Sequence, residues 1–117
     1  MRTITINGKN YTIEYGQNAV CALEDVVHMP LSEIIDTISK GGVNMRLIRA
    51  LFWAGLLSHN RGLSLERAGD ILDQAGSNFK AVYSAVGEEL IDSFVMQIIP
   101  VDEQPKEDDA KNIEGTV

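Results

Sequence analysis

The chain has 117 residues, of which 44% are hydrophobic, and a formal net charge of −7. This length suits one domain with a substantial core, and no apolar run approaches the roughly 18 to 20 residues that cross a bilayer. No basic stripe is present, which disfavours nucleic-acid binding. A lone cysteine excludes an internal disulfide, and the first ten residues do not resemble a signal peptide, so we expect a protein of the reducing cytoplasm.

The first element is a predicted β-hairpin over residues 2–15, in the sequence TITINGKNYTIEY. Asn7-Gly8 separates two alternating runs and suits the positive φ angles of a type I′ turn. The resulting register pairs Ile6 with Lys9, Ile4 with Tyr11, and Arg2 with Ile13. One face then carries Ile4, Ile6, Tyr11, Ile13 and Tyr15. Because a lone hairpin is only marginally stable, we expect this face to lie against helices.

After Gly16 the apolar period lengthens and predicts helices over about 18–28, 31–39, 45–58, 65–75 and 79–98. Their expected N-caps include Asn18, Asn44 and Ser64, and Gly41-Gly42 and Pro100 are expected stops. The predicted fold is therefore mainly α, with an N-terminal β-hairpin followed by a compact bundle of about five helices. These elements form one globular domain over residues 1–100.

Residues 101–117 follow this domain and contain six acidic side chains and two lysines, hence a net charge of −4. With few apolar residues, this segment cannot bury enough surface to offset the cost of ordering. We expect a flexible, disordered acidic tail.

The third helix is apolar almost all the way round, as expected of a helix surrounded by others. Its apolar residues are Met45, Leu47, Ile48, Leu51, Phe52, Trp53, Leu56 and Leu57. We interpret Trp53 as a core residue. Arg46 and Arg49 are three residues apart and emerge on one side of the helix. We expect them to pair with internal carboxylates, and contact with another subunit is the alternative.

No catalytic constellation is present in the sequence. His28 and His59 lie near predicted helix ends without the spacing of a zinc site, and Cys21 reads as a small buried hydrophobe. The pairs Glu24-Asp25 and Glu88-Glu89 are adjacent on helices, so their side chains diverge. We therefore expect no enzymatic activity, no metal and no cofactor.

The end of the last helix, FVMQIIP over residues 94–100, holds more apolar side chains than one helical stripe can bury. Both core packing and a partner surface remain open for it. Together with the two arginines, it supplies the candidate partner-binding residues. They are Arg46, Arg49, Phe94, Met96, Ile98 and Ile99.

The body of the chain, about residues 2–98, resembles the tail assembly chaperones of long-tailed, siphovirus-like phages, prophages and gene transfer agents. In that family an LxxLE helix precedes an LRALLWAGL-like helix and an LTLEEVGDLL-like helix. The matching residues here are Ala22-Leu23-Glu24, Leu47 to Leu57, and Leu63 to Leu72. These are packing motifs, and no active-site residue is carried over with them.

The resemblance implies a protein of the bacterial host cytoplasm that is absent from the mature virion. It would bind the tape-measure protein, keep it soluble and help to recruit tail-tube subunits, acting as a homo-oligomer. Members of the family are often made in a second, frameshifted form, and Ala110-Lys111-Asn112 is compatible with a slippery codon run. Two other interpretations stay open: a head–tail connector protein, and a small acidic regulatory module.

Overall fold

The computed structural model describes residues 1–42 and 44–98, with side chains described as far as residue 94. The elements are β1 (Arg2–Ile6), β2 (Lys9–Ile13), α1 (Gln17–Val27), α2 (Leu31–Ser39), α3 (Met45–Leu57), α4 (Leu65–Asp73), a 3-10 turn η1 (Gly76–Asn78) and α5 (Phe79–Ile98). The predicted mainly α fold with an N-terminal hairpin is confirmed. The expected acidic tail, residues 101–117, lies outside the described residues.

The hairpin has the predicted register, with Ile6 opposite Lys9 and Ile4 opposite Tyr11. Asn7 and Gly8 have φ angles of 51° and 81°, as a type I′ turn requires. The predicted apolar face is the inner one, because Ile6 and Ile13 are buried while Thr3 and Thr5 are exposed.

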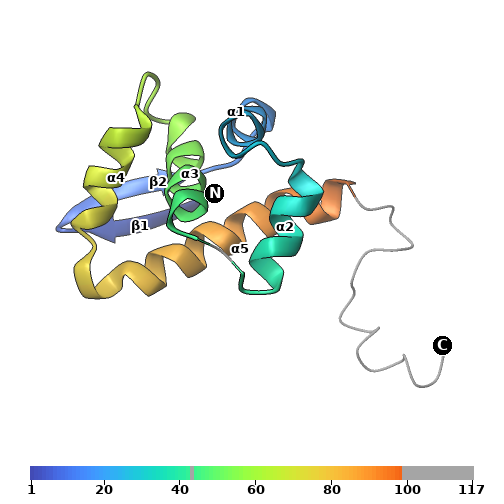
Figure 1. Ribbon diagram of the computed structural model, residues 1–117. Coiled ribbons are helices and arrows are strands. Elements are labelled where there is room, and N and C mark those ends of the chain that lie inside the picture. Colours follow the sequence, from blue (N-terminus) through green and yellow to red (C-terminus); the bar gives the residue numbers. More distant parts are fainter. Residues whose placement is uncertain (43, 99–117) are drawn as a thin grey trace.

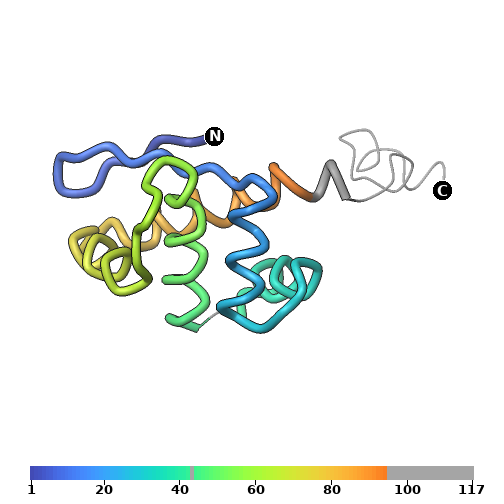
Figure 2. The backbone as a smooth tube through the Cα atoms, turned by 90° about the horizontal axis from the view of Figure 1, so that it is seen from above, coloured from blue at the N-terminus to red at the C-terminus, as the bar shows by residue number. Residues whose placement is uncertain are grey.

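Helix α3 lies at the centre and packs against α1, α4, α5 and β2 (Figures 1 and 2). In Figure 1, α5 runs below the hairpin, α3 and α4, and it contacts β1, α2 and α3. Within the described part of the chain, none of the helices has both the length and the apolar character needed to cross a membrane.

The helix ends confirm two of the three predicted N-caps. Asn44 Oδ1 accepts a hydrogen bond from the Leu47 amide at 2.9 Å, and Ser64 Oγ accepts one from the Arg67 amide at 3.0 Å. The prediction for Asn18 is wrong, because α1 begins at Gln17 and its N-cap is Gly16, two residues before Asn18. The diglycine after α2 ends that helix as predicted, with Gly41 in the left-handed region at φ 75°.

Strand β2 continues into a close contact with the C-terminal half of α3. A Cβ added at Gly55 would lie 2.7 Å from Ile13 Cγ2 and 3.0 Å from the Tyr15 hydroxyl oxygen. The Glu14 amide donates to the Gly55 carbonyl at 2.9 Å, and the Tyr15 hydroxyl donates to the Leu51 carbonyl at 2.5 Å. Only a glycine lets backbone and side chains approach α3 this closely.

The same open end of the hairpin, where Arg2 pairs with Ile13, is also tied to α5 through Arg2. Its guanidinium lies 2.5 Å from Asp92 and 3.7 Å from Glu88, and its Nε lies 3.2 Å from Glu89 without the alignment of a hydrogen bond. Glu89 is buried and also lies 2.6 Å from the Met1 amino group. The hairpin therefore bridges α3 and α5.

Two predicted core residues are exposed. Cys21 lies on the outer face of α1, since it is about 200° around the helix from the buried Ala19 and Leu23. Met45 is 62% exposed because it opens the first turn of α3, beyond the neighbouring helices. Trp53 is only partly buried, and its Nε1 donates to the Leu63 carbonyl at 2.7 Å.

Gly55→Ala should destabilise the protein by about 1–3 kcal/mol, because the added methyl group overlaps buried side chains. Gly87→Ala is the matched control, since a Cβ there would lie at an ordinary 3.5 Å from Ile38 Cγ2. In α5 that change should stabilise by up to about 1 kcal/mol through helix propensity. Urea unfolding of both variants measures the difference, and equal effects would contradict the role assigned to Gly55.

Burial, and secondarily the negative charge of Glu89, raise the pKa of the Tyr15 hydroxyl well above its ordinary value. The unfolded chain therefore releases this proton first, at about pH 10, while the folded protein retains it. Stability should be unaffected by this group below about pH 9 and should fall as the pH rises past about 10. Urea unfolding of wild type and Tyr15→Phe across that range tests this, since the variant should lose that part of the alkaline decline.

Candidate binding groove

A cavity of about 590 Å³ lies where the corner between α1 and α2 faces the N-terminal ends of α3 and α4. We call it the arginine groove. The described residues that line it are Val26, Val27, His28, Met29, Thr37, Gly42, Asn44, Arg46, Leu47, Arg49 and Leu65. Its wall combines partly buried aliphatic side chains with two arginines, and none of these lining residues carries a carboxylate.

The wall formed by α1 and α2 is held in place by Glu24. Its carboxylate accepts a hydrogen bond from the Leu31 amide at 2.6 Å and so satisfies a free donor at the start of α2. Its carbonyl accepts from the amide of His28, which ends α1 in the left-handed region with φ 58°. From the sequence, Glu24 was noted only as one of two adjacent carboxylates whose side chains diverge. Pro30 could have indicated this role for Glu24, because proline as an N-cap offers no side-chain acceptor and the first amides of α2 need one from elsewhere.

Arg46 and Arg49 are both exposed, and neither forms an ion pair with a described residue. The internal pairing that we expected is therefore not found in the described part of the chain. The stem of Arg49 lies against Gly69 of α4, where an added Cβ would be 3.1 Å from Arg49 Cδ. The same arginines border a smaller hollow of about 270 Å³ that includes Met45, Leu72 and Asp73.

The charge of the groove comes from the two guanidinium groups. Helices α3 and α4 begin at the groove and α1 ends there, while the lining includes Met29 before the start of α2 and Gly42 after its end. Helix ends carry about half a unit charge, positive at the N-terminus and negative at the C-terminus, so the contributions of these ends oppose one another. Two full positive charges beside an apolar wall remain. Such a surface suits a segment with both acidic and apolar side chains.

Of the three predicted contact residues whose side chains are described, the two arginines line this groove and Phe94 does not. Phe94 is 7% exposed and belongs to the hydrophobic core, so its assignment to a partner surface was wrong. It continues the buried stripe of α5 that contains Val82, Val86 and Leu90. Met96 and Ile98 lie in the last turns of α5, but their side chains are outside the described part, as is Ile99 altogether.

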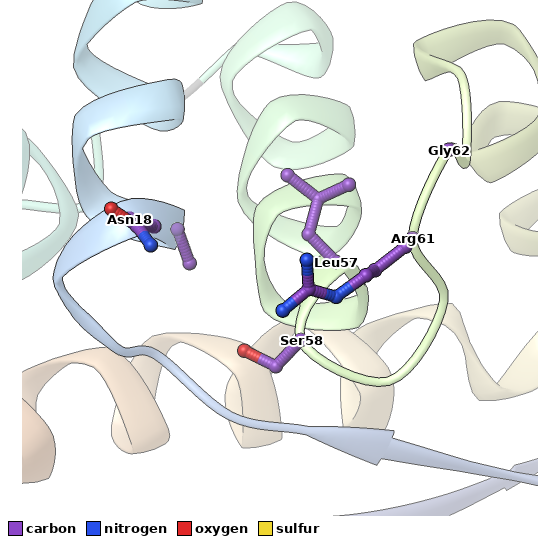
Figure 3. Close-up of a pocket in the computed structure, with 6 residues that line it drawn as sticks. Asn18, Leu57, Ser58, Arg61 and Gly62 are labelled. Carbon is purple, nitrogen blue, oxygen red and sulfur yellow. The ribbon is translucent and has the colours of Figure 1, made fainter.

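A second cavity, of about 340 Å³, lies at the opposite end of α3. Figure 3 shows Arg61 extending from the loop after α3 across the end of that helix, toward Asn18 of α1. Its lining contains a single charged side chain and fewer apolar ones than the arginine groove. We therefore regard the arginine groove as the stronger binding surface.

The two histidines lie at the surface of the domain. His59 contacts Glu14 at 2.7 Å on the surface, and His28 is an exposed helix end. Among the residues that the structure describes, no group of three or more His, Cys, Asp or Glu side chains is arranged to hold a metal ion. Comparisons of this chain with protein-family models, with curated proteins and with solved structures gave no match.

Glu24→Ala should cost about 1 kcal/mol of stability, because the α2 amide of Leu31 loses its acceptor. Glu24→Gln retains an acceptor and should cost less, and Asp25→Ala on the exposed neighbouring position is the matched control. Thermal unfolding of the three variants measures the order. If Asp25→Ala were as destabilising as Glu24→Ala, the capping role would be excluded.

Proposed function

We propose that this protein is a non-catalytic tail assembly chaperone of a long-tailed phage, prophage or gene transfer agent. It binds the tape-measure protein, keeps it soluble and helps to recruit tail-tube subunits, the latter through a longer frameshifted form. It acts in the bacterial host cytoplasm as a homo-oligomer coating its client and leaves before the virion matures.

The observation that carries the proposal is the arginine groove. A long client that is insoluble by itself needs a partner that covers apolar side chains while adding charge. The groove offers aliphatic walls from Val26, Val27 and Met29, with Arg46 and Arg49 beside them. An amphipathic client helix with acidic residues next to its apolar stripe would fit this surface.

The resemblance in the sequence supports the same proposal. Its three segments fall in α1, in α3 and at the start and body of α4. Each of these helices supplies residues to the groove, as Val26, Leu47 and Leu65 illustrate. Two of the three segments that carry the resemblance thus supply lining residues of the groove, and the remaining one, in α1, ends two residues before Val26.

The proposal is tested by co-expressing the full chain with the tape-measure protein encoded downstream and measuring soluble complex by size exclusion and light scattering. Wild type should hold the client in solution with many copies per client. Arg46→Glu with Arg49→Glu should reduce client binding at least about tenfold, because each lost charge-assisted contact contributes about 1.5 kcal/mol or more.

Arg61→Glu with Arg67→Glu is the matched control, since it makes the same charge change at exposed arginines outside the groove. Equal losses in both double variants would mean that overall charge, and not the groove, binds the client. A client that precipitates beside soluble wild-type protein would overturn the chaperone assignment. A fixed copy number in purified particles would favour a connector protein instead.

A further inference from the structure

We propose that the arginine groove is occupied by the acidic C-terminal segment of the same chain, residues 101–117, when no other partner is bound. The segment would act as an internal competitor for the groove. This inference concerns the unbound protein and holds whatever the identity of the external partner.

Charge complementarity is the first argument. The groove combines Arg46 and Arg49 with a lining that contains no carboxylate among its described residues. The segment carries six acidic side chains and two lysines, with three acids in succession at Glu107, Asp108 and Asp109. Carboxylates that approach these guanidinium groups replace part of their hydration with charge-assisted hydrogen bonds.

Composition along the segment matches the two parts of the groove. The acidic run at residues 107–109 is followed by Ile113, an aliphatic side chain of the size that the apolar wall accepts. Val26, Val27 and Met29 supply that wall and are each only partly buried. This segment therefore combines acidic and apolar side chains, as does the client segment that the groove would bind.

Reach does not limit this arrangement. Glu107 lies nine residues after Ile98 and Ile113 lies fifteen after it, so an extended chain carries them up to about 30 Å and about 50 Å from the end of α5. The protein measures 49 × 29 × 24 Å, so these spans are comparable with its own dimensions. Attachment to the same chain gives the segment an effective concentration in the millimolar range, so even weak affinity for the groove fills it.

The test places a spin label near the end of the full-length chain and observes backbone amides by NMR. Thr116→Cys carries the label and preserves every acidic residue, and Cys21→Ser removes the exposed natural thiol. The label should selectively broaden the amides of Val27, Arg46 and Arg49. Amides of the loop after α3, around Gly62, should keep their intensity because they lie at the other end of that helix.

Arg46→Gln with Arg49→Gln should abolish the selective broadening, while the matched pair Arg61→Gln with Arg67→Gln should leave it in place. Added salt should weaken it, since exposed charges are screened. Broadening that is uniform over the surface, or that persists in the Arg46/Arg49 variant, would overturn the proposal. A mixed sample tests whether the segment of one chain binds the groove of another. In it, the spin-labelled chains carry no nitrogen isotope label, and the isotope-labelled chains that are observed carry no spin label. Broadening there would assign the groove to the segment of a second copy and would also overturn occupancy within one chain.

Discussion

The fold depends on the absence of a side chain at Gly55. Helix α3 is enclosed by other elements, and β2 reaches it only because Ile13 and the Tyr15 ring occupy the place of a Cβ. The two hydrogen bonds from Glu14 and Tyr15 to α3 carbonyls follow from that proximity. A two-stranded hairpin is marginal by itself, so its stability here comes from this contact and from the Arg2 contacts with α5. The hairpin in turn holds α3 and α5 together.

In α3, the residues that stabilise the fold and the residues that border the proposed binding groove lie at different ends of the helix. Gly55 and Arg46 are nine residues apart on α3, or about 13 Å at 1.5 Å per residue. The C-terminal half of the helix receives the hairpin, whereas its N-terminal turns border the arginine groove. A rigidly held α3 fixes the arginines against the corner of α1 and α2 without requiring an ion pair to orient them. Their guanidinium groups are consequently available to an external carboxylate.

The carboxylates of the described domain and those of residues 101–117 have different physical roles. Glu24 and Glu89 lie within the fold and satisfy a helix amide or the hairpin's positive groups. Leaving either partner alone would place an unpaired polar group in a poorly hydrated site. The acidic residues of 101–117 follow the described domain and have a composition complementary to the groove. In the proposed competition, this segment and a client are therefore both attracted to Arg46 and Arg49 through their acidic side chains.

Local chemistry in the sequence determined the hairpin register, the helix positions and two helix caps. Asn7-Gly8 accepts only a few turn types, and Asn44 and Ser64 bond to amides three residues away, so these features need no tertiary information. The candidate site was predicted only in part. Arg46 and Arg49 were recognised because they interrupt an apolar helix. The sequence did not predict that they would face the corner between α1 and α2.

Tertiary structure alone decided the rest, because those contacts join residues distant in the sequence. By local propensity alone, Gly55 only destabilises its helix. Its packing role arises from the contact with Ile13, which is 42 residues earlier in the sequence. Phe94 and Cys21 were assigned to the wrong environments because periodicity identifies an apolar stripe but not how far its neighbours cover it. Glu24 gained its role from the turn at Pro30, which brings the start of α2 back to α1. The sequence by itself thus determined the elements, and packing determined which of their surfaces remain open to bind.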